Sequence, residues 1–269
     1  MYIENINLPK DIKKLSVEQL SVLAEEVRTA LIRKLSEHGG HIGPNLGMVE
    51  TTIALHYVFN SPIDKIVFDV SHQSYVHKML TGRMAAFLDP AKYDDVTGYT
   101  NPDESEHDFF TIGHTSTSVS LAMGLAKGRD LIGGKENIIA VIGDGSLSGG
   151  EALEGLNNAA MLGSNMIIIV NDNDQSIAEN HGGLYKGLKE LRDTNGESPD
   201  NIFKAMGLEY YYLGDGHDVS ALIKLFTSVK DIDRAVVLHI HTIKGKGLKY
   251  ADENKEYWHA GGPFQDRKS

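Results

Sequence analysis

Ile138-Ile139-Ala140-Val141-Ile142-Gly143-Asp144-Gly145 is an apolar run that ends in a Gly-Asp-Gly motif. Ile167-Ile168-Ile169-Val170-Asn171-Asp172-Asn173 has the same design further along the chain, with Asn-Asp-Asn after the apolar run. Short runs of this kind, rich in β-branched residues, are typical of buried strands. Residues 149–162 between them read as a helix, so the pattern predicts a strand–helix–strand unit. The two strands of such a unit lie parallel and end at the same edge of the sheet.

Asp144 and Asn173 are therefore expected to meet at the edge where ligands of open α/β sheets bind. Carboxylate and amide oxygens are hard ligands, and Mg²⁺ typically takes one or two carboxylates together with substrate phosphate oxygens. Each motif alone is also typical of an ordinary turn, but the pair at this spacing favours a magnesium ion that clamps a phosphorylated cofactor. A dinucleotide fingerprint is a poor competitor, because its third glycine would fall on Ser148.

The rest of the chain continues the alternation of strands and helices. We expect helices over residues 16–37, 48–59, 119–130 and 218–229, and further buried strands over residues 66–70 and 235–240. Ser16 and Gln19 fit a capping box at the start of the first helix. This order predicts a single α/β domain over residues 1–269, with a mostly parallel sheet and helices on both faces. Its candidate loops converge on one edge and carry His72, His114, Asp144, Asn173 and Lys244.

Composition narrows the class of protein. The chain has 269 residues, a net charge of −11 and no basic run, which argues against a nucleic-acid binder. It has no cysteine, so it has no disulfide and no thiolate metal site. No apolar run approaches the ~20 residues of a membrane span, and the N-terminus lacks the apolar core of a signal peptide. We expect a cytoplasmic protein.

Twelve histidines are a rich supply for a chain of this length. The run from Gly113 to Ser118 (Gly-His-Thr-Ser-Thr-Ser) leads into a predicted helix, where free backbone N–H groups suit an anion; ordinary N-capping by the hydroxyls is the alternative. Residues 81–110 are expected to form a functional loop, and residues 179–200 the most mobile segment. Histidines that we interpret as surface or capping residues are His38, His56, His77, His107 and His217.

Four motifs carry a family resemblance. They are Gly40-His41-Ile42-Gly43-Pro44-Asn45-Leu46-Gly47, Phe68-Asp69-Val70-Ser71-His72-Gln73-Ser74-Tyr75-Val76-His77-Lys78, the Gly113–Ser118 run, and Gly214-Asp215-Gly216-His217-Asp218-Val219. With them, the chain resembles the N-terminal half of the 1-deoxy-D-xylulose-5-phosphate synthase family, from about residue 5 to residue 264. The wider relatives are transketolases, and the Gly-Asp-Gly…Asn pattern is similar to their thiamine-diphosphate motif. The implied fold is the diphosphate-binding (PP-type) domain of these enzymes.

The resemblance implies thiamine diphosphate and Mg²⁺ as cofactors. Asp144, Asn173 and the backbone carbonyl of Gln175 would hold the metal ion. The other implied cofactor contacts are His72, Gly113, His114, Thr115, Gly145 and Ser146. His41 and His259 would face the reacting carbonyl of the substrate, where a histidine can donate to an oxygen or move a proton. Lys244 would add positive charge on the substrate side, and we group it with these candidate catalytic residues.

The sequence also departs from the family pattern. Leu248, which we include in the cofactor site, stands where the synthases carry a tyrosine, and Ser71 replaces the usual glycine before His72. Residues 181–200 are expected to be shorter than in the synthases. The relatives carry a pyrimidine-binding domain with an activating glutamate beyond this point. We therefore expect a partner subunit that supplies the pyrimidine-binding and C-terminal domains, in a dimer of heterodimers.

Three functions remain open on sequence grounds. The first is a synthase-like transfer of two-carbon units between small sugar phosphates, with pyruvate as the donor. The second is a split transketolase that moves a ketol unit between sugars without decarboxylation. In the third, the chain is a non-catalytic diphosphate-binding or regulatory subunit, which the intact set of Asp144, Asn173, His41 and His259 disfavours.

Overall fold

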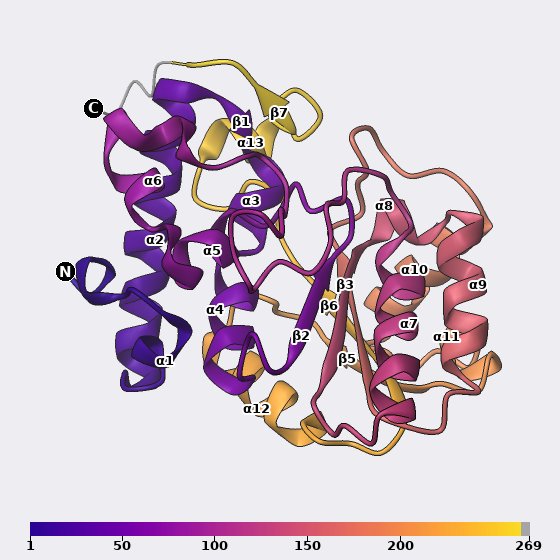
Figure 1. Ribbon diagram of the computed structural model, residues 1–269. Coiled ribbons are helices and arrows are strands. Elements are labelled where there is room, and N and C mark those ends of the chain that lie inside the picture. The colour runs from indigo at the N-terminus through magenta and orange to yellow at the C-terminus, as the bar shows by residue number, and fades with distance from the viewer. Residues whose placement is uncertain (265–269) are drawn as a thin grey trace.

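The computed structural model describes residues 1–264 and contains a central five-stranded parallel sheet (Figure 1). Its strand order is β2-β3-β4-β6-β5, and every neighbouring pair is parallel. The strands are β2 (Lys65–Phe68), β3 (Ile138–Gly143), β4 (Met166–Asp172), β5 (Glu209–Leu213) and β6 (Ala235–His241). Four of them confirm strands predicted from the sequence. β5 was not predicted; it is an edge strand and is less buried than its neighbours.

Alternation along the central strands divides the apolar core into two faces. Ile138, Ala140 and Ile142 of β3 pack on one face with α7 (Ser118–Leu131), α9 (Gly150–Ala159) and α10 (Gly183–Asp193). Ile139 and Val141 face the other way, toward α4 (Val49–Val58) and α12 (Val219–Val229). Successive side chains of a strand point to opposite faces, so a continuous apolar run requires helices on both sides. The predicted three-layer α/β fold is confirmed.

Helices from the N-terminal part of the chain form an outer layer at one side of the molecule (Figure 1). Helix α2 (Val17–His38) begins with the predicted capping box, in which Ser16 Oγ accepts from Gln19 N at 3.3 Å and Gln19 Oε1 accepts from Ser16 N at 2.8 Å. The short elements around it are η1 (Ile3–Asn5), α1 (Pro9–Ile12), α3 (Gly43–Gly47), α5 (Tyr75–Lys78), η2 (Met79–Arg83), α6 (Ala85–Leu88) and η3 (Pro90–Asp95).

Five further short elements complete the described chain: α8 (Asp144–Leu147), α11 (Ile202–Ala205), α13 (Lys249–Glu253), and the antiparallel pair β1 (Gly40–His41) and β7 (Ala260–Gly261). Residues 183–193, within the stretch expected to be most mobile, form α10, whose Leu188 and Leu191 are buried. No helix within residues 1–264 combines the length and the apolarity needed to cross a membrane.

The interpretation of five histidines as surface or capping residues is wrong for four of them. His56 and His77 are fully buried, His107 is 5% exposed and the side chain of His217 is 4% exposed. His56 Nε2 and His77 Nδ1 lie 2.9 Å apart, and His77 Nε2 lies 2.9 Å from Asp108 Oδ1. A buried imidazole is tolerated when its nitrogens have partners. Only His38, with a side chain 41% exposed, fits the surface interpretation.

The same buried cluster fixes the long irregular segment before α7. Asp108 also accepts from Arg83, and the buried ammonium of Lys78 lies 2.5 Å from Glu104. These contacts join α5 and η2 to the segment around residues 97–110. The segment is irregular in backbone but is held by paired charges, which explains how it can approach the functional edge of the sheet in a defined position.

Candidate functional site

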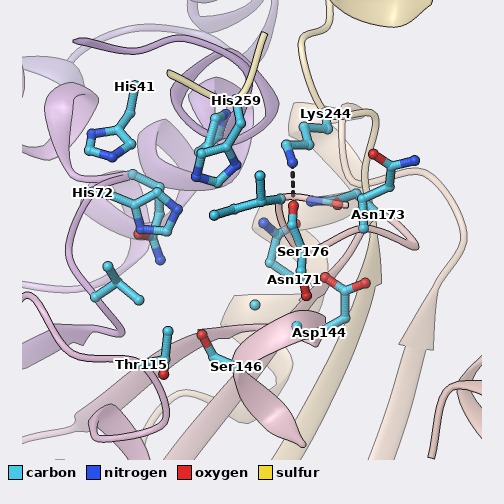
Figure 2. A pocket seen from close by; sticks show the side chains of 17 residues that line it. His41, His72, Thr115, Asp144, Ser146, Asn171, Asn173, Ser176, Lys244 and His259 are labelled. Carbon is cyan, nitrogen blue, oxygen red and sulfur yellow. Dashed lines mark hydrogen bonds between the residues drawn. The ribbon is translucent and has the colours of Figure 1, made fainter. Parts of the chain in front are cut away.

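A cavity of about 350 Å³ opens at the carboxyl ends of the central strands (Figure 2). Loops after β2, β3, β4 and β6 line it, together with the start of α3 and the segment before β7. This is the edge predicted for ligand binding. Figure 2 shows His41, His72 and His259 at one end of the cavity and Asp144 and Asn173 at the other.

Backbone pairing brings His41 and His259 together, and His72 lies beside them. In the β1–β7 pair His41 lies opposite Ala260, and Ile42 N donates to His259 O at 3.0 Å. The ring centroids of His41 and His259 are 5.8 Å apart, those of His41 and His72 are 5.1 Å apart, and those of His72 and His259 are 5.5 Å apart. A histidine cluster from three distant parts of the sequence is thus built into one wall.

Asn45 holds two of these histidines in place. Its buried side-chain amide donates to the carbonyl oxygens of His41 and His72, both at 2.8 Å, and its Oδ1 accepts from Tyr75 N at 2.9 Å. One amide therefore satisfies three backbone groups that are far apart in sequence. The asparagine of the Gly-Pro-Asn-Leu-Gly segment therefore has a structural role, and contact with a ligand is not needed to explain its presence.

Burial keeps the imidazoles neutral. It is the largest cause that lowers the pKa of His72 to about 3 and that of His259 to about 4, and repulsion from Lys244 and from His41, when His41 is protonated, adds to both shifts. Burial also lowers the pKa of His41. Nδ1 of His72 and Nδ1 of His259 are buried without a hydrogen-bond partner among the described residues. The cavity therefore offers neutral imidazoles with unused nitrogen atoms.

Asp144 lies at the first position of α8 and is 1% exposed. Burial, followed by the neighbouring carboxylate of Asp172, raises the pKa of Asp144 to about 8. Its Oδ2 accepts one hydrogen bond from Asn180 Nδ2 at 2.6 Å, and within residues 1–264 it forms no salt bridge. A buried carboxylate in this state is stabilised by a bound cation.

Strand alternation explains which side chains of the Asn-Asp-Asn motif reach the cavity. Asn171 and Asn173 line it, whereas Asp172 points to the opposite side and bonds to His239 Nε2 at 2.7 Å and Arg192 at 2.6 Å. Burial opposes the ionisation of Asp172, but these two partners lower its pKa overall. The Oδ1 atom of Asn173 is buried without a partner in the described chain, as is Oε1 of Gln175.

Ser71 has a backbone conformation that usually favours glycine. Val70 and Ser71 have φ values of 57° and 67°, in the left-handed region that favours glycine. The Ser71 hydroxyl donates to Ile112 O at 2.9 Å and accepts from Thr100 N at 2.9 Å. These bonds anchor the strained turn to residues 100 and 112. His72, the next residue, then enters the cavity.

The N-terminus of α7 already holds an anion. The carboxylate of Asp69 accepts from Ser116 N and Ser118 N, each at 2.9 Å. Neither hydroxyl capping nor a free anion site, the two alternatives raised by the sequence, describes this end of the helix. Thr115 lines the cavity, whereas Gly113 and His114 are exposed and lie outside its lining.

Lys244 and Leu248 have opposite surroundings. Lys244 Nζ donates to Ser176 O inside the cavity (Figure 2), and burial lowers its pKa to about 8. Leu248 is 4% exposed and packs in the core formed by the N-terminal helices.

The structure thus brings together ten of the predicted site residues: His41, His72, Thr115, Asp144, Gly145, Ser146, Asn173, Gln175, Lys244 and His259. Gly113, His114 and Leu248 lie elsewhere.

Some lining residues were not predicted from the sequence. Asn171 could have been found, because strand alternation places it on the same side as Asn173. Ser176 and Ile177 follow the motif in an irregular segment, where no periodic signal exists. Among the described residues, no three His, Cys, Asp or Glu side chains form a metal cluster; the set expected here has only one such side chain, Asp144.

Comparison with known proteins identifies the family. The model of the 1-deoxy-D-xylulose-5-phosphate synthase family matches residues 3–198 and 193–242. The 1-deoxy-D-xylulose-5-phosphate synthase of Bacteroides fragilis is 41% identical over 297 positions, which cover 96% of this chain and 46% of that protein. The synthase of Thermus thermophilus is 40% identical over 301 positions, covering 100% of this chain and 49% of that protein.

Solved structures agree on the fold. Transketolase from Campylobacter jejuni superposes with a TM-score of 0.71 at 19% identity, over 92% of this chain and 41% of that chain. Transketolase from Leishmania mexicana gives a TM-score of 0.65 at 19% identity, over 92% and 39%. At this level of identity the likeness concerns the fold alone.

The alignments also locate a difference in length. The Thermus alignment spans more positions than the 269 residues of this chain, so that relative carries residues that this chain lacks. The two segments matched by the family model overlap at residues 193–198, which lie inside the region expected to be shorter than in the synthases. The chain spans about half the length of the curated relatives it matches. Because the family model covers most of its residues, the chain belongs to the 1-deoxy-D-xylulose-5-phosphate synthase family.

Proposed function

We propose that this chain is the diphosphate-binding part of a thiamine-diphosphate- and Mg²⁺-dependent enzyme that transfers two-carbon units between small sugar phosphates. The observation that carries the proposal is the make-up of one cavity. The buried carboxylate of Asp144 and the unpartnered Oδ1 of Asn173 lie at one end, and the three neutral histidines lie at the other. A metal-clamped diphosphate fits the first end and a reacting carbonyl fits the second.

The residues present fit the proposed metal ion. Asp144 is a buried carboxylate whose raised pKa reflects burial and the nearby Asp172. Asn173 Oδ1 is a buried acceptor that nothing in the described chain satisfies. With the backbone carbonyl of Gln175, these groups would supply three oxygen ligands, and the remaining positions around Mg²⁺ are those that phosphate oxygens and water usually take.

The diphosphate would lie beside Gly145, Ser146, His72 and Thr115. The backbone before these residues faces open space, since a Cβ atom added at Gly143 would meet no heavy atom within 4 Å, whereas one added at Gly145 would clash with Ser176 Oγ. The chemistry that thiamine diphosphate supplies when bound is the cleavage and formation of carbon–carbon bonds next to a carbonyl group. The protein's own contribution is to hold the groups in place and to exchange protons.

His41 and His259 would perform the proton exchange. Both are neutral near pH 7, because burial lowers their pKa values. A neutral imidazole can donate a hydrogen bond from one nitrogen to a substrate oxygen, or accept the substrate's proton on the other. Lys244, held by Ser176 O, would place an ammonium group near the anionic parts of the substrate.

We further propose that a pyrimidine-domain subunit closes this site, in a dimer of heterodimers. The curated relatives are about twice as long as this chain, so they contain a second module. Ile177 lines the cavity yet is 59% exposed, and Tyr257, two residues before His259, is 71% exposed. Exposed apolar side chains beside a site are typical of a surface that another module covers.

The family match supports the decarboxylating, synthase-like reaction over the sugar-to-sugar transketolase, because the matched relatives at 40–41% identity are synthases. Leu248, in the place of the tyrosine usual in the synthases, is one departure from that family's pattern. Leu248 packs in the core and does not line the cavity.

The reaction is tested with carboxyl-labelled pyruvate, glyceraldehyde 3-phosphate, thiamine diphosphate and Mg²⁺, using this chain co-purified with a pyrimidine-domain subunit. We expect labelled carbon dioxide only when both polypeptides are present. An intact complex that binds the cofactor but releases no label would point to ketose donors and the transketolase alternative. Inactivity with every donor would leave the non-catalytic subunit.

Cofactor binding is expected to depend on pH through Asp144. Without a cation this carboxyl group is protonated below about pH 8, so Mg²⁺ has to displace a proton. Apparent Mg²⁺ affinity should therefore fall on the order of tenfold for each pH unit below 8. Titration calorimetry of the complex in buffers of different ionisation enthalpy would show the released proton. An Asp144→Asn variant should release none, and equal proton release by both proteins would contradict the assignment.

A further inference from the structure

The Gly214–Val219 motif belongs to the family pattern but lies outside the cavity. Gly216 brings this loop directly against the end of β6, because a Cβ atom there would lie 2.5 Å from Ile240 Cγ2 and 2.7 Å from His241 O. Gly216 N donates to His241 O at 2.8 Å. The following residue, His217, is therefore fixed relative to the strand that leads to Lys244.

His217 accepts a hydrogen bond from the residue before Lys244. Ile243 N donates to His217 Nε2 at 2.8 Å, and His217 Nδ1 lies 2.9 Å from Glu50 Oε2. A backbone N–H can only donate, so Nε2 must carry the lone pair and Nδ1 must carry the proton. The ring is thus neutral and has one defined orientation, with a carboxylate on one side and the backbone of the Lys244 turn on the other.

Glu50 is itself fixed from the other side. Arg28 forms a buried ion pair with Glu50 Oε1 and also donates to Leu46 O at 2.7 Å and to Lys246 O at 3.0 Å. The Arg28–Glu50–His217 group therefore binds the Lys244 turn at two points, residue 243 through His217 and residue 246 through Arg28. The turn is also held by a bond from Gly245 N to Gly43 O at 3.0 Å and by Lys246 Nζ, which lies 3.8 Å from Glu50 Oε1.

We propose that His217 is a positioning residue, which uses Nε2 to hold the backbone of Ile243 so that the Lys244 ammonium enters the cavity and bonds to Ser176 O. The position of Lys244 follows from the observed contacts alone. Any benefit of this position to catalysis rests on the proposed function. His217 itself lies outside the cavity lining.

Two substitutions separate this role from simple packing. In His217→Gln the side-chain amide can reach the position of Nε2 and accept from Ile243 N. In His217→Asn the shorter amide matches Nδ1, so it can still donate to Glu50 but cannot reach Ile243. The measured quantity is the acetylation rate of Lys244 in the folded chain, followed by mass spectrometry, with Lys14 as the internal reference because its side chain is 72% exposed.

We expect His217→Asn to accelerate Lys244 acetylation relative to Lys14 by on the order of tenfold, the equivalent of one hydrogen bond. His217→Gln should stay within about twofold of the parent protein. Unchanged Lys244 reactivity in both variants, or equal acceleration in both, would overturn the proposal. The assay uses neither cofactor nor substrate, so its result is independent of whether the proposed enzymatic function holds.

Discussion

Replacing Asp144 with alanine is expected to lower the affinity of the assembled protein for both Mg²⁺ and thiamine diphosphate by at least about a hundredfold, because removal of even an outer partner of a metal ligand costs 10- to 100-fold. Asp144 is the only carboxylate in the proposed metal set. Without it Mg²⁺ would be held less tightly, and the negative charge of the diphosphate would be less neutralised. Equilibrium titration of the cofactor at fixed Mg²⁺ measures the effect.

The same substitution should leave the protein without ligand at least as stable as the parent. The folded state raises the pKa of Asp144, which means that the folded state loses stability as the pH rises toward about 8. Asp144→Asn, which keeps the shape of the side chain, is the matched control and should show the same loss of binding with an equal or higher Tm near pH 7. Cofactor affinity that is unchanged in both variants would remove Asp144 from the metal site.

Replacing His259 with alanine is expected to lower turnover by about 10²- to 10³-fold, within the range for loss of a group that transfers protons. Cofactor affinity should change little, because His259 lies with the histidines at the end of the cavity away from Asp144. The steady-state rate and the cofactor titration are measured on the same preparation of the assembled complex.

His38→Ala is the control for this variant, since the His38 side chain is a partly exposed surface imidazole bonded to Asp94. It should retain turnover close to that of the parent protein. If His259→Ala lost cofactor binding instead of turnover, His259 would belong to the cofactor part of the site. Turnover equal to that of the His38 variant would remove it from the reaction.

Local sequence patterns were sufficient to predict four of the five strands of the sheet and the edge at which the cavity opens. The strands that precede Asp144 and Asn173 are continuous apolar runs, and parallel topology sends their ends to one edge. The two motifs could therefore be placed together from the order of residues alone. The position of His41 and His259 came only from the family resemblance; the reason for it, pairing of β1 with β7, involves two-residue strands that carry no periodic signal.

Long-range polar pairs could not be predicted. The burial of His77 depends on Asp108, and the capping of α7 depends on Asp69, which lies 49 residues before Ser118. Residue type alone favours the surface for a histidine, and only the folded chain supplies the partner that reverses this preference. Leu248 illustrates the same limit, because the number of residues that separates it from His259 does not define which way its side chain faces.

The most direct test of the account is to locate the divalent ion. Crystals of the assembled protein with thiamine diphosphate and Mn²⁺ in place of Mg²⁺ would reveal the ion by its anomalous scattering. We predict one peak within about 2.2 Å of an Asp144 carboxylate oxygen, Asn173 Oδ1 and the Gln175 carbonyl oxygen, a little longer than typical Mg²⁺ distances. Bound cofactor with no peak there, or with the ion held by other residues, would contradict the proposed site.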